Sequence, residues 1–178
     1  MLEVIRMRRS VRSYLGKEIE KEKLDEVLKA AMFAPTGRNL RPWEFVVVTD
    51  NETRKQLSVA TPYASCARDA PLVLVICYDL NKGRRFKEDC SLCAGHVYLE
   101  ATNQGLGTCF VQIADGTEAE VGNPEEYVKR LLGIPEPYRV QCLLPMGYPV
   151  KVPEAHADEE FESAKVHYGK FSQTAPSL

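Results

Sequence analysis

Short apolar runs alternate along this chain with segments of helical periodicity, and this alternation limits the fold more than any other feature. Residues 45–48 (Phe-Val-Val-Val) and 72–77 (Leu-Val-Leu-Val-Ile-Cys) are uninterrupted apolar runs of strand length. The second run is typical of a strand that is buried on both faces. Neither run approaches the ~20 residues that cross a bilayer, so we expect sheet strands and no membrane span.

Helices are expected where apolar residues recur at intervals of three and four, or where a capping residue and a glycine bound a polar segment. These signals predict helices at residues 2–8, 19–34, 51–60, 87–104 and 124–132. Strands are predicted at residues 43–48, 72–78, 108–113 and 138–146. About four strands interleaved with helices indicate the α+β class, with one mixed sheet flanked by helices.

The charge of the chain is balanced overall and uneven locally. Its 178 residues carry a formal net charge of −2, which gives no reason to expect nucleic acid or a membrane surface as partner. Residues 1–16 nevertheless hold four arginines, and residues 154–162 hold five acids. We expect one domain over residues 1–150 and a C-terminal extension or arm over residues 151–178. The first residues lack the apolar stretch of a secretory signal, so a cytoplasmic location is expected.

The six cysteines are expected to be reduced and mostly buried, because the chain is long enough to form a core without disulfides. Cys90 and Cys93, with His96, offer an alternative as a metal or redox site. No second cysteine pair accompanies them at ligand spacing, so we interpret them as core residues of a helix and expect no metal site. His156 and His167 are expected on the surface.

Two segments carry side chains suited to chemistry. Residues 8–12 (Arg-Arg-Ser-Val-Arg), here called the arginine turn, combine guanidinium and hydroxyl groups. Such groups hold a phosphate monoester, although a solvated basic face has the same composition. The loop at residues 35–43 bears a hydroxyl, an amide and two guanidinium groups, which suit a polyol or the edge of a heterocycle. An ordinary connection between helix and strand is the alternative.

Five segments together resemble the nitroreductase family of FMN-dependent flavoproteins. They are Arg-Arg-Ser-Val-Arg at 8–12, Ala-Pro-Thr-Gly-Arg-Asn at 34–39, Pro-Trp-Glu-Phe-Val-Val-Val at 42–48, Gly-Leu-Gly-Thr-Cys at 105–109 and Leu-Pro-Met-Gly-Tyr-Pro at 144–149. They occur in the family's order and span nearly all of the chain. The resemblance implies a mixed, mainly antiparallel sheet flanked by helices, and an intertwined homodimer with FMN at the subunit interface.

The resemblance also assigns cofactor-binding residues in three groups. The first group holds the FMN phosphate and ribityl chain, the second reaches the flavin from the other subunit, and the third lies against the isoalloxazine ring. In that order they are Arg8, Arg9, Ser10 and Arg12; Pro35, Thr36, Gly37 and Asn39; and Gln112, Ile113 and Ala114.

The implied activity is that of an FMN-dependent oxidoreductase. NADH or NADPH would reduce nitroaromatic, quinone or related acceptors by a ping-pong hydride mechanism at flavin N5, with no catalytic side chain. The same family resemblance covers reductive dehalogenation and flavin fragmentation. A non-enzymatic protein that binds flavin or nucleic acid is a further alternative, although no aromatic residues are interleaved with the arginines.

Three positions depart from the family's usual pattern. Arg41 stands where glutamine is common, and Ala114 stands where glycine is common. Beyond residue 149 the family often has basic residues that complete the phosphate site, whereas this chain has a run of acids. We expect that Lys151, Lys165 or Lys170 substitutes for them, or that the arginine turn holds the phosphate alone.

Overall fold

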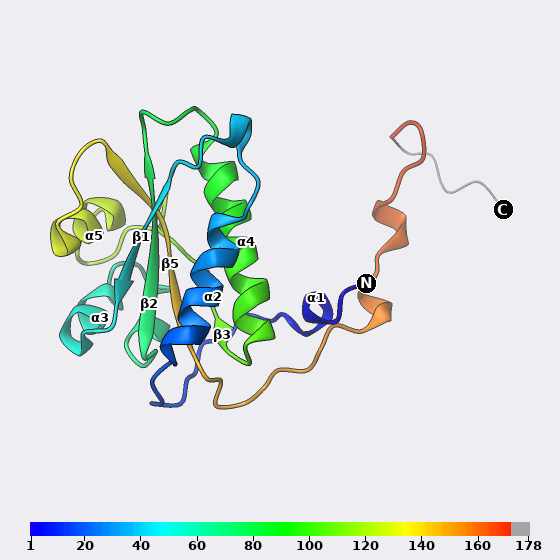
Figure 1. Cartoon of the computed structure of the whole chain (residues 1–178), viewed down its shortest axis with the longest axis horizontal. Helices are drawn as coiled ribbons and strands as arrows, with labels where there is room; N and C mark the ends of the chain where they lie inside the picture. Colours follow the sequence, from blue (N-terminus) through cyan, green and yellow to red (C-terminus); the bar gives the residue numbers. More distant parts are fainter. Residues whose placement is uncertain (172–178) are drawn as a thin grey trace.

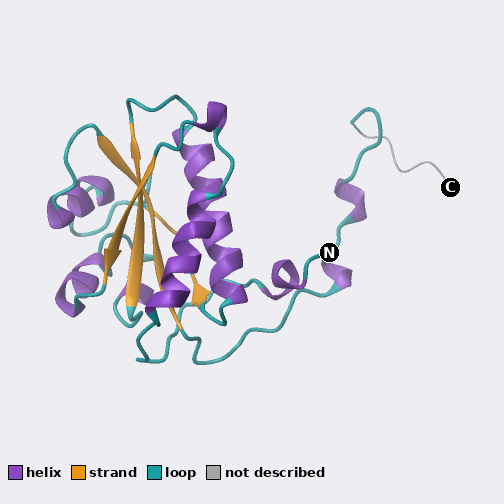
Figure 2. Ribbon diagram, viewed as in Figure 1, coloured by secondary structure: helices purple, strands orange, loops and turns teal. Residues whose placement is uncertain are grey.

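A central antiparallel pair of strands organises the computed structural model, which describes residues 1–171. β2 (Leu72–Asp79) and β5 (Tyr138–Gly147) form this pair (Figures 1 and 2). β1 (Trp43–Val48) extends the sheet beside β2, while β3 (Gly107–Thr108) and β4 (Val111–Gln112) both pair with β5. Every ladder between these strands is antiparallel, and Ser10 adds an isolated parallel bridge to Thr108. The predicted fold class is therefore confirmed.

Both faces of the sheet are covered by helices, as a fully apolar central strand requires. In Figure 1, α2 (Lys21–Met32) and α4 (Phe86–Asn103) cover one face, and α3 (Asn51–Leu57) and α5 (Pro124–Leu132) cover the other. Successive side chains of a strand point to opposite faces. Val73 and Val75 accordingly pack with the α3 and α5 side, and Leu74 and Ile76 with the α2 and α4 side. A strand buried on both faces was the sequence-based prediction, and every residue of β2 is buried.

The predicted strand at 108–113 is the element that differs most from expectation. It is divided into β3 and β4, so the sheet has five strands instead of about four. The interruption faces Pro145 of β5, which has no amide hydrogen to offer a neighbouring strand. The carbonyl of Pro145 is instead approached by the Thr108 hydroxyl at 2.8 Å, the Tyr14 hydroxyl at 2.9 Å and the Cys109 N–H at 3.4 Å. Two side-chain hydroxyl groups thus supplement one long backbone bond at this point.

The N-terminal helix and the chain that follows β5 lie together outside the sheet and its four covering helices. Figure 1 shows the N-terminal helix α1 (Glu3–Met7) beside the chain that follows β5. That chain contains two short 3₁₀ turns, Asp158–Glu160 and Ser163–Lys165. Residues 172–178, the end of the expected arm, lie outside the described residues. Within the described part, no helix has both the length and the apolar character needed to cross a membrane.

One partly buried ion pair fixes α5 to the sheet. The carboxylate of Glu125, whose side chain is 10% exposed, accepts hydrogen bonds from Arg139 at 2.5 and 2.6 Å and from the Val140 N–H at 2.9 Å. Burial raises the pKa of this carboxyl, but the bonds from Arg139 and Val140 outweigh that effect and lower it below its usual value of 4.5. The pair therefore stabilises the fold only while Glu125 is ionised.

Replacing Glu125 with glutamine should lower the free energy of unfolding at pH 7 by about 2 kcal/mol, because a buried charged hydrogen-bond acceptor is lost. The lowered pKa means that the wild-type advantage is full above pH 4.5 and disappears as the pH falls through the folded-state value. Urea unfolding at several pH values measures both effects. The exposed Glu52–Lys55 pair supplies the control, since Glu52→Gln should change stability little. An equal loss in both variants would contradict this role of Glu125.

Candidate functional site

The arginine turn is held in place by Val11. The Val11 N–H donates to the Thr108 carbonyl at 2.9 Å, and the Tyr14 hydroxyl donates to the Val11 carbonyl at 2.5 Å. The Val11 side chain lies so close to Gly107 that a Cβ there would be 2.5 Å from it, so only glycine fits. This packing turns Val11 into the core and leaves the polar residues around it on the surface.

Tyr98 of α4 lies beneath the arginine turn. Its hydroxyl is 3.3 Å from the Ser10 hydroxyl and accepts the Phe110 N–H at 2.5 Å, while the Arg8 guanidinium carbon lies 5.4 Å from the centre of its ring. Burial raises the pKa of Tyr98, so its hydroxyl stays protonated and can act as a donor. No motif identified this residue, because its role depends on how α4 packs.

His156 of the arm also reaches the arginine turn, and its side chain, expected on the surface, remains 34% exposed there. The imidazole is half-buried, with Nε2 3.3 Å from Arg8 and Nδ1 3.3 Å from Arg9 and 2.7 Å from Glu160. The backbone N–H of His156 donates to the Arg6 carbonyl at 2.9 Å. The arm thus brings an imidazole and a carboxylate to the basic turn, which sequence spacing across some 150 residues gave no means to foresee.

Two of the three arginines in the arginine turn have no acidic partner in the described structure. Arg6 pairs with Asp158 at 2.7 Å and Arg9 approaches Glu160 at 3.7 Å. Arg8 and Arg12 form no ion pair within residues 1–171. In the same part of the chain, none of the three lysines proposed to complete a phosphate site contacts the turn. They are Lys151, Lys165 and Lys170.

Arg12 borders a cavity of about 580 Å³, together with Cys109 and Gln112, on which neither Arg8 nor Ser10 lies. A hydrogen bond from the Cys66 thiol, and then the Arg12 guanidinium, hold the pKa of Cys109 below its usual value. The same bond raises the pKa of Cys66. Within this pair the lower pKa therefore belongs to Cys109, which lies beside the Arg12 guanidinium.

The residues assigned to the isoalloxazine ring differ in accessibility. Gln112 is exposed, whereas Ile113 and Ala114 are buried, with their N–H groups bonded to the Gln141 carbonyl at 3.0 and 3.1 Å. Their amide hydrogens are already used inside the sheet. A ligand beside this stretch would meet Gln112 first.

The 35–39 loop is fixed at the other end of α4. The Gly37 N–H donates to Asp89 in the first turn of that helix at 3.0 Å. Arg38, Asn39 and Arg41 all have positive φ, at 56°, 56° and 46°. Non-glycine residues adopt this conformation at a cost that the surrounding contacts must offset. Here those contacts are the Arg41 N–H to the Thr36 hydroxyl at 3.2 Å and Arg41 Nε to Asn39 at 3.0 Å.

One chain does not bring the two groups of predicted cofactor residues together. The 35–39 loop is attached to α4 at Asp89, and the arginine turn rests on α4 at Tyr98. Nine residues of helix separate these points, a rise of ~14 Å along the axis. Pro35, Thr36, Gly37 and Asn39 therefore lie apart from Arg8, Arg9 and Ser10 in the same chain.

The cysteine pair of α4 lies in the core. Cys90 and Cys93 are fully buried, and burial raises the pKa of both thiols. His96 places Nδ1 3.1 Å from the Ala30 carbonyl, so it is held by a neighbouring helix. All six cysteines fall within the described residues, where they are buried and free of disulfides. No group of three potential metal ligands occurs in residues 1–171.

Comparisons with known proteins agree over most of the chain. The Nitroreductase family matches residues 5–62 and 58–148. A protein of Methanothermobacter thermautotrophicus, provisionally named NADH dehydrogenase/NAD(P)H nitroreductase, is 32% identical over 174 residues, which cover 96% of this chain and 87% of that protein. The iodotyrosine deiodinase of Thermotoga neapolitana is 24% identical over 84% of this chain and 88% of that protein. The structure of an FMN-dependent nitroreductase from Clostridium difficile R20291 is 36% identical, has a TM-score of 0.92 and covers 96% of this chain and 100% of that one.

Proposed function

Because the chain belongs to the nitroreductase family, we propose that it is an FMN-dependent oxidoreductase that uses NADH or NADPH to reduce nitroaromatic, quinone or related acceptors. The observation that supports this most directly is the arginine turn. Arg8 forms no ion pair in the described structure and lies with the Ser10 hydroxyl on Tyr98, whereas Arg12 borders another cavity. A basic surface that binds no phosphate would not need the serine and tyrosine hydroxyl groups that lie beside Arg8.

The donor set of this turn fits the phosphate of FMN. Guanidinium groups bind phosphate oxygens in pairs, and a hydroxyl adds a short hydrogen bond to the same group. Arg8 and Ser10 would hold the phosphate, Tyr98 would orient Ser10, and the His156 ring would lie beside Arg8 at the edge of the site. Bound FMN supplies the ring that accepts and donates hydride. The protein residues then hold this group and limit access of water to it.

The nicotinamide and the acceptor are proposed to occupy one site in turn, which is the ping-pong order expected from the family. The likeness to an iodotyrosine deiodinase supports a second candidate, reductive dehalogenation on the same cofactor. Binding of nucleic acid is a poorer candidate, because Asp158 and Glu160 of the arm interrupt the basic surface around Arg6 and Arg9.

The first test is whether the purified protein binds FMN and turns over. We expect a yellow protein that oxidises NADH or NADPH only when a nitroaromatic or quinone acceptor is present, with parallel double-reciprocal plots. Iodotyrosine in place of these acceptors tests the second candidate. A colourless protein that takes up no added FMN would overturn the proposed function.

The phosphate assignment is tested by comparing FMN with riboflavin, which lacks the phosphate. Arg8→Ala should weaken FMN binding roughly tenfold to hundredfold, since a charged hydrogen bond is worth about 1.5–3 kcal/mol. Ser10→Ala should weaken it by a smaller factor, and both variants should bind riboflavin much as the wild type does. Quenching of flavin fluorescence measures all the affinities. The exposed Arg130 of α5, on the other face of the sheet, supplies a matched Arg→Ala control. Equal losses for both flavins would contradict the assignment.

We further propose that two chains form each cofactor site. The loop of residues 35–39 would then act on the FMN that the arginine turn of the other chain holds, which removes the ~14 Å separation along α4 as an obstacle. Leu92 of α4 and Ile5 and Met7 of α1 are exposed apolar residues that a second chain would cover. The arm, with Phe161 72% exposed and Phe171 85% exposed, is proposed to pack on that second chain as well.

Mixing two defective variants tests this shared site. Arg8→Ala removes the phosphate contact, and Asn39→Gly removes the loop amide while keeping its positive φ. Each variant alone should be poorly active. In a mixed dimer one site inherits both defects and the other inherits neither, so unfolding and refolding the mixture should restore on the order of a quarter of wild-type activity. Sedimentation should show twice the 20.0 kDa chain mass. No recovery on mixing, or a flavin-loaded monomer, would overturn the shared site.

A further inference from the structure

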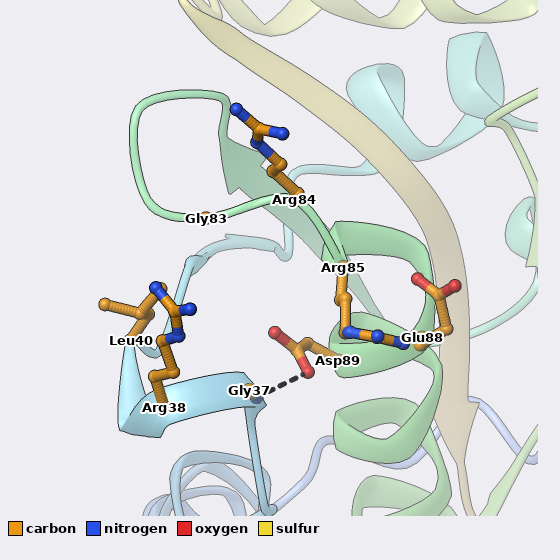
Figure 3. A pocket seen from close by; sticks show the side chains of 8 residues that line it. All are labelled: Gly37, Arg38, Leu40, Gly83, Arg84, Arg85, Glu88 and Asp89. Carbon is orange, nitrogen blue, oxygen red and sulfur yellow. Dashed lines mark hydrogen bonds between the residues drawn. The ribbon is translucent and has the colours of Figure 1, made fainter.

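Three arginines that the proposed cofactor site does not use line the same cavity. This cavity, of about 740 Å³, lies between the loop at residues 37–40 and the first turns of α4. Figure 3 shows Arg38 rising from the loop, with Arg84 and Arg85 on the segment that leads into α4. Asp89 points into the space between the loop and the helix and bonds to Gly37. We call this space the arginine cavity.

The charge around the arginine cavity is positive on balance. Lys82 and Lys87 flank the two helix-side arginines, but Lys82 is 3.6 Å from Glu44 and Lys87 pairs with Asp115. Within residues 1–171, Arg38, Arg84 and Arg85 form neither an ion pair nor a side-chain hydrogen bond.

The two acids in the cavity wall do not cancel this charge. They are Glu88 and Asp89, and Asp89 is buried and already accepts the Gly37 N–H. Three arginines and two acids therefore line the cavity, and Figure 3 shows Arg85 extending toward Glu88 while Arg84 extends away from both acids. The excess of positive charge favours an anionic ligand.

The walls of the arginine cavity are closely fitted. A Cβ on Gly83 would be 3.0 Å from the Leu40 side chain, and a Cβ on Gly37 would be 3.7 Å from Cδ of Arg85. The loop and the segment before α4 thus approach closely at Gly83, whereas the distance at Gly37 is that of an ordinary contact. Arg38 is further held at a φ of 56°, a conformation that few side chains adopt without a compensating contact. The arginines therefore project from a defined framework.

We propose that the arginine cavity binds an oxyanionic group, a phosphate or a carboxylate, of a substrate. The planar guanidinium group matches both anions because each offers paired oxygens. The proposal rests on the proposed function, since Gly37 belongs both to this cavity and to the loop assigned to the flavin of the other chain. The anion has two possible sources, a phosphate of the nicotinamide dinucleotide and a carboxylate on the acceptor.

Two variants remove the charge without strain. Arg84→Gln changes an exposed residue that has no side-chain partner in the described structure. Arg85→Gln does the same at the neighbouring exposed arginine of the cavity, and the double variant carries both substitutions. The exposed Arg130→Gln on α5 is the matched control. FMN content and melting temperature should be the same in the cavity variants, the control and the wild type. If the double variant is unstable, the single Arg84→Gln variant is used alone.

The experiment compares each anion with a neutral or less charged counterpart. Rapid mixing gives the concentration dependence of flavin reduction by NADPH and NADH, and of reoxidation by nitrobenzoate and nitrobenzyl alcohol. For the anion that uses the cavity, the double variant should need roughly tenfold more ligand, in line with loss of a charged contact. If only the required concentration of NADPH rises, the cavity binds the ribose phosphate. If the required concentrations of both dinucleotides rise, it binds the pyrophosphate. If only the required concentration of nitrobenzoate rises, it binds an acceptor carboxylate. Equal values for variants and wild type with all four compounds would overturn the proposal.

Direct binding separates this proposal from the proposed function. Calorimetry of the FMN-loaded wild type and the variants with nitrobenzoate and with pyrophosphate needs no turnover. Binding that is lost in Arg84→Gln but kept in Arg130→Gln supports the cavity even if no acceptor is reduced. Reduction of nitrobenzyl alcohol without any difference in anion binding would leave the oxidoreductase assignment intact and exclude the cavity as an anion site.

Discussion

Burial of β2 on both faces is the constraint from which the rest of this structure follows. Its alternating side chains supply two cores at once, so helices must cover both sides of the sheet. α4 is the longest of those helices and packs along one whole face. Both candidate binding segments are attached to α4, the 35–39 loop at Asp89 and the arginine turn at Tyr98. The hydrophobic core thereby determines where polar chemistry occurs on the surface.

Local electrostatics matter more here than the balanced total charge. The arm pairs Asp158 with Arg6 and brings Glu160 near Arg9, so the basic front and the acidic rear of the sequence partly neutralise each other. Arg8 and Arg12 form no ion pair in the described structure, and neither do the arginines of the arginine cavity. Two regions of positive charge remain, at opposite ends of α4. Their separation is consistent with distinct anions at the two places, a cofactor phosphate and a substrate group.

Sequence patterns predicted the fold well because its main elements carry local signals. The strand at 43–48 and the helix that starts after Asn123 and ends before Gly133 were found at their observed bounds. The break between β3 and β4 was missed, since it depends on Pro145 in a distant strand. The candidate site was predicted in part: motifs indicated the arginine turn and the 35–39 loop. Tyr98, His156 and Arg84 carry no motif, because tertiary packing alone brings them to their positions.

The attachment of two loops to one helix has a consequence for how such a sequence can change. Between Asp89 and Tyr98 the chain is continuous helix, so each residue adds ~1.5 Å and turns the following side chains by ~100°. Insertion or deletion of a single residue in this interval would shift one loop relative to the other and move Tyr98 to a different side of the helix. The amino acids in this interval can change where packing allows it, but their number cannot change. The length of this interval is therefore expected to be inherited unchanged, even where its amino acids are not.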